Sequence, residues 1–99
     1  MATVHVELQE GWTGEQVEMW VNGSRWYSGR PSTRLQTGYA DGVVVNVSTA
    51  LVRLDVRLPE VSIEASRSMP IKSDQHWIGV SRLNDTVLVV DQSSPFGYA

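Results

Sequence analysis

Apolar residues recur at every second position in seven short segments of this 99-residue chain, and no helical stretch lies between the segments. Because successive side chains of a strand point to opposite faces, this period predicts strands with one buried face. Almost the whole chain is therefore expected to build one antiparallel scaffold. The segments are Val4-Val6-Leu8, Val17-Met19-Val21, Val43-Val45-Val47, Val52-Leu54-Val56-Leu58, Val61-Ile63-Ala65, Ile78-Val80 and Val87-Val89.

Glycine, proline and asparagine mark the ends of these strands. Asn22-Gly23 is typical of a two-residue hairpin turn, which needs positive φ at both positions. Proline cannot donate to a central ladder, so Pro59 is expected in a tight turn with Glu60, and Pro70 in the connection after the next strand. Strands are predicted at about 3–8, 16–21, 24–27, 43–47, 50–58, 61–66, 75–82 and 86–91.

Residues 28–42 carry three glycines and a proline and show no clean alternation. A connection of this length is long for a compact domain, so it is expected to be functional or to hide a short strand, for which 33–37 is the candidate. About eight strands with regular turn signals predict a single all-β domain over 1–99, a β-sandwich or a small barrel. Residues 92–99 are predicted to form a C-terminal tail.

Composition excludes several classes of function. A net charge of −3 argues against nucleic acid, because a duplex-binding domain would show a basic balance. No apolar stretch approaches the roughly 20 residues of a membrane helix, so no membrane partner is expected. The absence of cysteine suits a reducing compartment and predicts the cytoplasm, although an exported protein whose signal had been removed would look the same.

The sequence predicts no enzyme and no cofactor. His5 and His76 are the only imidazoles, and His5 alternates with valines, so it is expected to face solvent. Asp74 and His76 would share one strand face, but a metal site needs three or four ligands, so the pair is interpreted as solvent-facing. The acidic pairs Glu15/Glu18 and Glu60/Glu64 are interpreted as solvated charge rather than glycosidase carboxylates.

Aromatic and arginine side chains gather around the Asn22-Gly23 hairpin and the long loop. Flat rings stack on sugars, and guanidinium groups donate to hydroxyls or carboxylates, which is the chemistry of a carbohydrate-binding surface. The competing interpretation is that one of Trp26 and Tyr27 fills the core while the other covers an exposed sheet face. The candidate residues are Arg25, Trp26, Tyr27, Arg30, Arg34 and Tyr39.

Two further tryptophans are candidates for binding. Trp20 alternates with Val17, Met19 and Val21, so it is expected on the outer face of its strand, as an oligomer interface or a ligand platform. Trp12, in a glycine-flanked turn, is either a second platform or a lid over the open end of the fold. The tail at 95–98 would dock on a neighbouring subunit or close the edge of its own sheet.

These observations predict a non-catalytic binding module. Protein–protein interaction is the first hypothesis, including self-association as a homodimer through Trp20, residues 25–27 and the tail. Carbohydrate binding through Trp26, Tyr27, Arg30 and Arg34 is the alternative. The sequence does not choose between a protein partner and a glycan.

Overall fold

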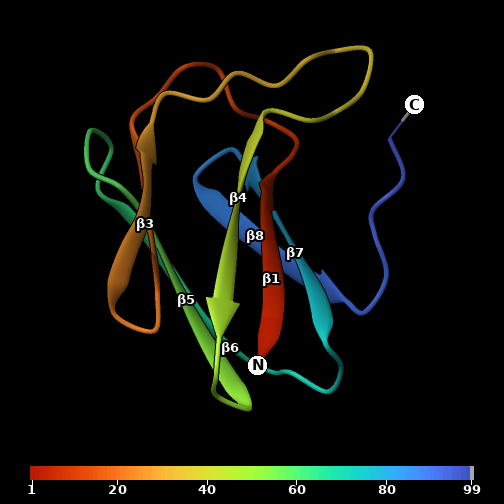
Figure 1. Cartoon of the computed structure of the whole chain (residues 1–99). Coiled ribbons are helices and arrows are strands. Elements are labelled where there is room, and N and C mark those ends of the chain that lie inside the picture. The colour runs from red at the N-terminus through yellow and green to blue at the C-terminus, as the bar shows by residue number, and fades with distance from the viewer. Residues whose placement is uncertain (99) are drawn as a thin grey trace.

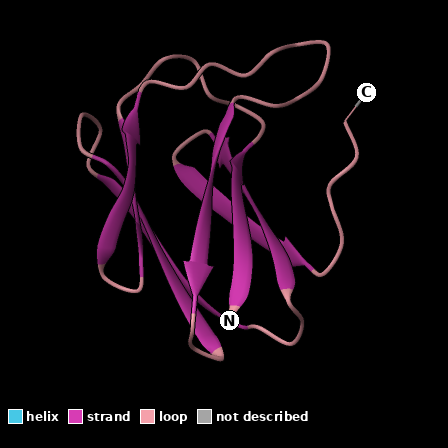
Figure 2. Cartoon of the chain, viewed as in Figure 1, coloured by secondary structure: helices cyan, strands magenta, loops and turns pink. Residues whose placement is uncertain are grey.

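The computed structural model describes residues 1–98 and contains eight strands and no helix in that range (Figures 1 and 2). The chain is all-β, as predicted, and its strands form two four-stranded sheets packed as a β-sandwich. The strands are β1 (Ala2–Leu8), β2 (Val17–Val21), β3 (Ser24–Gly29), β4 (Asp41–Val47), β5 (Leu51–Leu58), β6 (Ile63–Pro70), β7 (Gln75–Leu83) and β8 (Thr86–Gln92).

One sheet has the order β4-β1-β7-β8 and the other β3-β2-β5-β6. The purely antiparallel scaffold expected from the sequence needs one correction, because β1 and β7 pair in parallel. The two strands are far apart in the chain, and the segment between them visits the other sheet twice, so nothing forces them to run in opposite directions. All other pairs are antiparallel.

The core lies between the sheets and consists of the alternating residues that the sequence pattern picked out. Every second residue of β1, from Ala2 to Leu8, is buried, and so is every second residue of β2 and β5. The intervening side chains of β1 and β2 are only partly covered, among them His5 and Trp20, which confirms their predicted outward direction. One buried face per strand is what holds the two sheets together.

The first hairpin turn was predicted correctly, but the bounds of β6 were not. Asn22 and Gly23 have φ values of 51° and 86°, as the turn between β2 and β3 requires. The strand expected at 61–66 begins instead at Ile63, because the turn occupies four residues, 59–62. Pro70 is the last residue of β6 rather than part of a connection, and β6 is an edge strand, where proline is tolerated.

The long connection hides no strand. Residues 35–37 form a turn closed by hydrogen bonds from the Thr37 and Gly38 amides to the Arg34 carbonyl oxygen, so the strand predicted at 33–37 is wrong. Ser32 forms only an isolated bridge with Thr13. Glycine at 38, with φ of 73°, ends the turn in the left-handed region and prevents an extended continuation.

Trp12 belongs to the core rather than to a surface. Its side chain is 2% exposed, and its indole Nε1–H donates to the carbonyl oxygen of Val80 at 3.1 Å. The prediction of a ligand platform at Trp12 is therefore wrong, while the alternative, a lid on the end of the sandwich, agrees with its place. A buried indole needs such an acceptor, because an unpaired N–H in the core is costly.

The Trp12→Phe variant should lower the free energy of unfolding by about 1–3 kcal/mol, because it leaves a gap in the core and removes the indole hydrogen bond to the Val80 carbonyl oxygen, which keeps only its bond from the Gln9 amide. The control change Leu35→Ala, at a side chain that is 98% exposed, should stay within about 0.5 kcal/mol of wild type. Urea unfolding followed by circular dichroism compares the two. Equal losses in both variants would contradict a core role specific to Trp12.

Candidate interaction surface

The two long sides of the sandwich differ in how they are closed. On one side β6 lies against β8, and Arg67 of β6 bridges the gap. Its guanidinium donates to the Val89 carbonyl oxygen and pairs with the Asp91 carboxylate at 2.9 Å. Asp91 also contacts His76 Nε2 at 2.7 Å. Arg67 thus joins β6 to β8, and a pocket of about 250 Å³ lined by Pro70, His76 and Asp91 lies at the end of this side.

His76 is therefore not the solvent-facing residue expected from the sequence. It is 6% exposed and lies on the inner face of β7 beside Ile78, with Asp91 as its partner. The expectation of an exposed Asp74/His76 pair is wrong for His76, because the inward register of β7 begins at residue 76, two residues before the apolar pattern starts at Ile78. Within residues 1–98, no group of three or more potential metal ligands is present.

The opposite side, between β3 and β4, is open. At one end the two strands are joined by a hydrogen bond from the Tyr27 hydroxyl to Asp41, at 3.0 Å. Burial and this carboxylate together raise the pKa of Tyr27 far above its ordinary value, so the hydroxyl stays protonated and donating. Figure 1 shows these edge strands, with β3 on the left and β4 in the centre.

Farther along, β3 and β4 leave a groove of about 220 Å³ between them. Trp26 lines it from β3 and is 48% exposed, while Val45 and Val47 line it from β4. Beside the groove, on the outer face of β4, Val44 is 58% exposed. We name the groove and the adjoining outer edge of β4 the open side.

A β-bulge places Trp26 at this edge. Met19 pairs with Tyr27, but the next residue, Trp20, pairs with Arg25, so Trp26 is the extra residue of the bulged strand. Tyr27 packs against the core while Trp26 stays outside it. This arrangement agrees with the sequence-based interpretation that one of Trp26 and Tyr27 packs in the core while the other lies on the surface.

The other predicted binding residues of the second sheet are occupied by partners within the chain. Trp20 is half-buried, and the Arg57 guanidinium lies 5.2 Å from the centre of its ring. Arg25 pairs with Glu18 at 3.4 Å. Trp20 also lines a groove of about 340 Å³ with Arg53, Asp55, Arg57, Glu64 and Ser66, in which the arginines already pair with the carboxylates.

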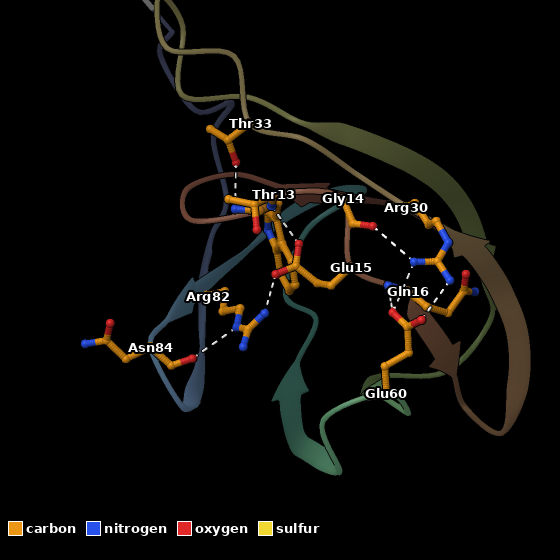
Figure 3. A network of polar contacts seen from close by, with 10 residues as sticks. Thr13, Gly14, Glu15, Gln16, Arg30, Thr33, Glu60, Arg82 and Asn84 are labelled. Carbon is orange, nitrogen blue, oxygen red and sulfur yellow. Dashed lines mark hydrogen bonds and ion pairs between the residues drawn. The ribbon is translucent and has the colours of Figure 1, made fainter.

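Loops from both sheets meet at one end of the sandwich, where a network of ion pairs and hydrogen bonds connects them (Figure 3). Arg30 donates to both oxygens of Glu60, at 3.1 and 2.8 Å, and Glu60 also accepts from the Gln16 amide. These bonds lower the pKa of Glu60. Arg30, predicted as a ligand-binding residue, is thus a bidentate partner of the turn that joins β5 and β6.

The second ion pair of this network is partly buried. The Glu15 carboxylate is 9% exposed, accepts from the Thr13 amide at 2.6 Å and pairs with Arg82. Burial alone would raise the pKa of Glu15, but its hydrogen bonds with the backbone and with Arg82 prevail and lower it. Glu15 is therefore not the solvated charge expected from the sequence, and it pairs with Arg82 while Glu18 pairs with Arg25.

The outer face of the β4-β1-β7-β8 sheet holds contacts that the sequence did not reveal. His5 and Trp77 stack across the parallel β1–β7 pair, with ring centres 4.7 Å apart. The sequence offered no signal for this stack, because it depends on the parallel register. Both rings are partly covered.

The C-terminal tail folds onto this same sheet. The Tyr98 hydroxyl donates to Glu7 and accepts from Gln9, and its ring meets Tyr39 edge-on at 5.2 Å. Burial and the Glu7 carboxylate raise the pKa of Tyr98 to about 12. Tyr39 of the long loop is thus a support for the tail. The Arg34 side chain is exposed in the same loop.

The residues proposed for a sugar site do not converge. Of Trp26, Tyr27, Arg30 and Arg34, only Trp26 lines the groove of the open side. Tyr27 bonds to Asp41, and Arg30 is held by Glu60. The geometry therefore offers one exposed tryptophan at a strand edge rather than a ring-and-arginine platform.

Comparison with known proteins gives no relative from which a site could be transferred. No protein-family model matches the chain, and no curated protein matches it. Among residues 1–98 there is no helix long and apolar enough to cross a membrane.

The Glu15→Gln variant tests the partly buried ion pair with Arg82. A carboxyl whose pKa is lower in the folded chain adds stability that is present above its unfolded pKa, about 4.3, and is lost as the pH falls through the folded pKa. The change should lower the free energy of unfolding at pH 7 by about 2–4 kcal/mol and flatten the loss of stability below about pH 4.

Glu64→Gln is the matched control, because its pair with Arg57 is solvent-exposed. This variant should change stability by less than about 1 kcal/mol. Urea unfolding from pH 2.5 to 7 measures both. A Glu15→Gln profile that runs parallel to wild type at every pH would show that Glu15 has no depressed pKa.

Proposed function

We propose that this chain is a non-catalytic protein interaction module that associates with a second copy of itself through the open side. The observation that carries the proposal is the contrast between the two sides of the sandwich. Arg67 closes one side with its bonds to β8, whereas the other presents Trp26 beside an uncovered strand edge. Tryptophan is the residue most enriched among interface hot spots.

The other large aromatic residues support this choice, since most already have partners. Trp12 is in the core, Trp20 lies under Arg57, and Trp77 stacks on His5. The tail, expected either on a neighbouring subunit or on its own sheet, makes its contacts within the chain. Trp26 is the remaining tryptophan with a largely exposed ring, and it faces a groove large enough for one or two apolar side chains.

Solution mass tests the proposal. Light scattering coupled to size-exclusion chromatography, over a hundredfold range of concentration, should show the mass rise from one copy toward two. Trp26→Ala should raise the dissociation constant of the dimer by about tenfold or more, because a truncated hot-spot residue costs more than about 1.4 kcal/mol.

Leu35→Ala is the control, because Leu35 is 98% exposed in the long loop, away from the groove. Its mass profile should match wild type. A strict monomer at every concentration would refute self-association, and a dimer that is unaffected by Trp26→Ala would place the interface elsewhere.

A further inference from the structure

Four strands lie at the edges of the two sheets, and three of them carry a feature that blocks further pairing. β3 has the bulge at Trp26, and β6 contains Pro70 and the inward-pointing Arg67. β8 receives the Arg67 guanidinium on the Val89 carbonyl oxygen. Each feature twists the strand, removes a backbone donor or occupies an outward backbone oxygen.

β4 has none of these protections. Its residues 43–47 read Val-Val-Val-Asn-Val, with no charge, no proline and no glycine, and its register with β1 runs unbroken from Asp41 to Val47. Alternate residues of such a strand point their N–H and C=O groups away from the sheet, where they are free to pair with another strand. β-branched residues also favour strand pairing.

We infer that β4 pairs antiparallel with β4 of a second copy, around a two-fold axis at Val44, so that two four-stranded sheets become one of eight strands. The inference rests on the proposed self-association and specifies its geometry. A two-fold axis makes the same patch serve both copies, as in most homodimers.

The sequence of β4 is compatible with itself in this register. Centring the pair on Val44 sets Val43 opposite Val45 of the second copy, and Asp41 opposite Val47 of the second copy. Each of the seven residues of β4 then lies opposite a residue of β4 in the second copy. The two Asp41 carboxylates lie at opposite ends of the ladder, about 20 Å apart at the rise of a strand, so like charges do not meet.

The same register keeps the core faces aligned. Directly opposite residues of an antiparallel pair point to the same face, so Val44 meets its counterpart on the outer face. Val43, half-buried in one copy, comes to lie beside the buried Val45 of the other on the inner face. This inner face borders the groove lined by Trp26, so the second copy would cover that ring.

The assembly stops at two copies. Pairing through β4 uses the open edge of this sheet in both copies, and the remaining edge, β8, is closed by Arg67. A closed dimer rather than a filament therefore follows from the difference between the two edges.

Disulfide trapping tests the register, because the chain contains no cysteine and a single Val44→Cys variant can cross-link only to another copy. At the two-fold axis the Cα atoms would lie about 4.5–5.5 Å apart, within the range that a disulfide spans. Mild oxidation should convert most of the protein to a covalent dimer that a reductant reverses. Leu88→Cys, an exposed position on the protected strand β8, should stay mainly monomeric under the same conditions.

Charge at the same position gives an independent readout. Val44→Lys puts two ammonium groups opposite each other at the axis and should raise the dissociation constant of the dimer at least tenfold, whereas Leu88→Lys should leave it unchanged. Both side chains are exposed, and urea unfolding checks that each variant folds.

The outcomes separate the two proposals. A wild-type dimer that survives Val44→Lys, together with equal trapping of the two cysteine variants, would overturn pairing through β4 and leave self-association standing. A wild-type chain that stays monomeric throughout would overturn the proposed function itself. If a lysine variant failed to fold, the cysteine pair would still decide the register.

Discussion

β1 lies between β4 and β7, antiparallel to the first and parallel to the second, and most of the molecule depends on this position. The parallel pair joins the N-terminal strand to the C-terminal hairpin, so the sheet is complete only when residues from both ends of the chain have paired. Beyond Leu8 the chain continues along β7, with the Gln9 amide donating to Val80 and the Arg82 amide donating to Glu10. Trp12 reaches its acceptor, the Val80 carbonyl oxygen, from this extension.

The same arrangement determines which strands remain at the edges. With β1 and β7 central, β4 and β8 are left outside, and in the second sheet β3 and β6 are. β6 and β8 fall on one side of the sandwich, where Arg67 takes an inward-facing position between Ala65 and Met69 and pairs with Asp91. β3 and β4 fall on the other side, where Tyr27 and Asp41 join them at one end only.

Period-two alternation was enough to predict the fold class and the outward face of β2, and Asn22-Gly23 was enough to predict the first hairpin, since each depends on local sequence. The parallel pair was not predictable, because a strand has the same alternation whichever way its neighbour runs. The inward position of His76 was missed for a related reason. A polar residue on an inner face breaks the apolar pattern, and only the three-dimensional contact with Asp91, which also pairs with Arg67, explains it.

The environment of the candidate binding residues was not predictable from local sequence either. Composition identified aromatic and arginine side chains but could not show that Arg30 is taken by Glu60, or that Arg57 covers Trp20. Trp26 is exposed because of a bulge, and a bulge is a matter of register between two strands rather than of one sequence segment. The open edge of β4 likewise becomes visible only once the strand order is known.

Binding surfaces of this fold must therefore be sought where partners within the chain are missing, not where reactive groups gather. Within residues 1–98 every buried side-chain nitrogen or oxygen has a hydrogen-bond partner, and the raised pKa values of Tyr27 and Tyr98 follow from burial and from bonds to Asp41 and Glu7 that join structural elements. Perturbed groups at catalytic sites are instead aimed at a cleft and a substrate. The open side leaves backbone groups along β4 and one indole ring beside it without partners, and another strand can satisfy both at once.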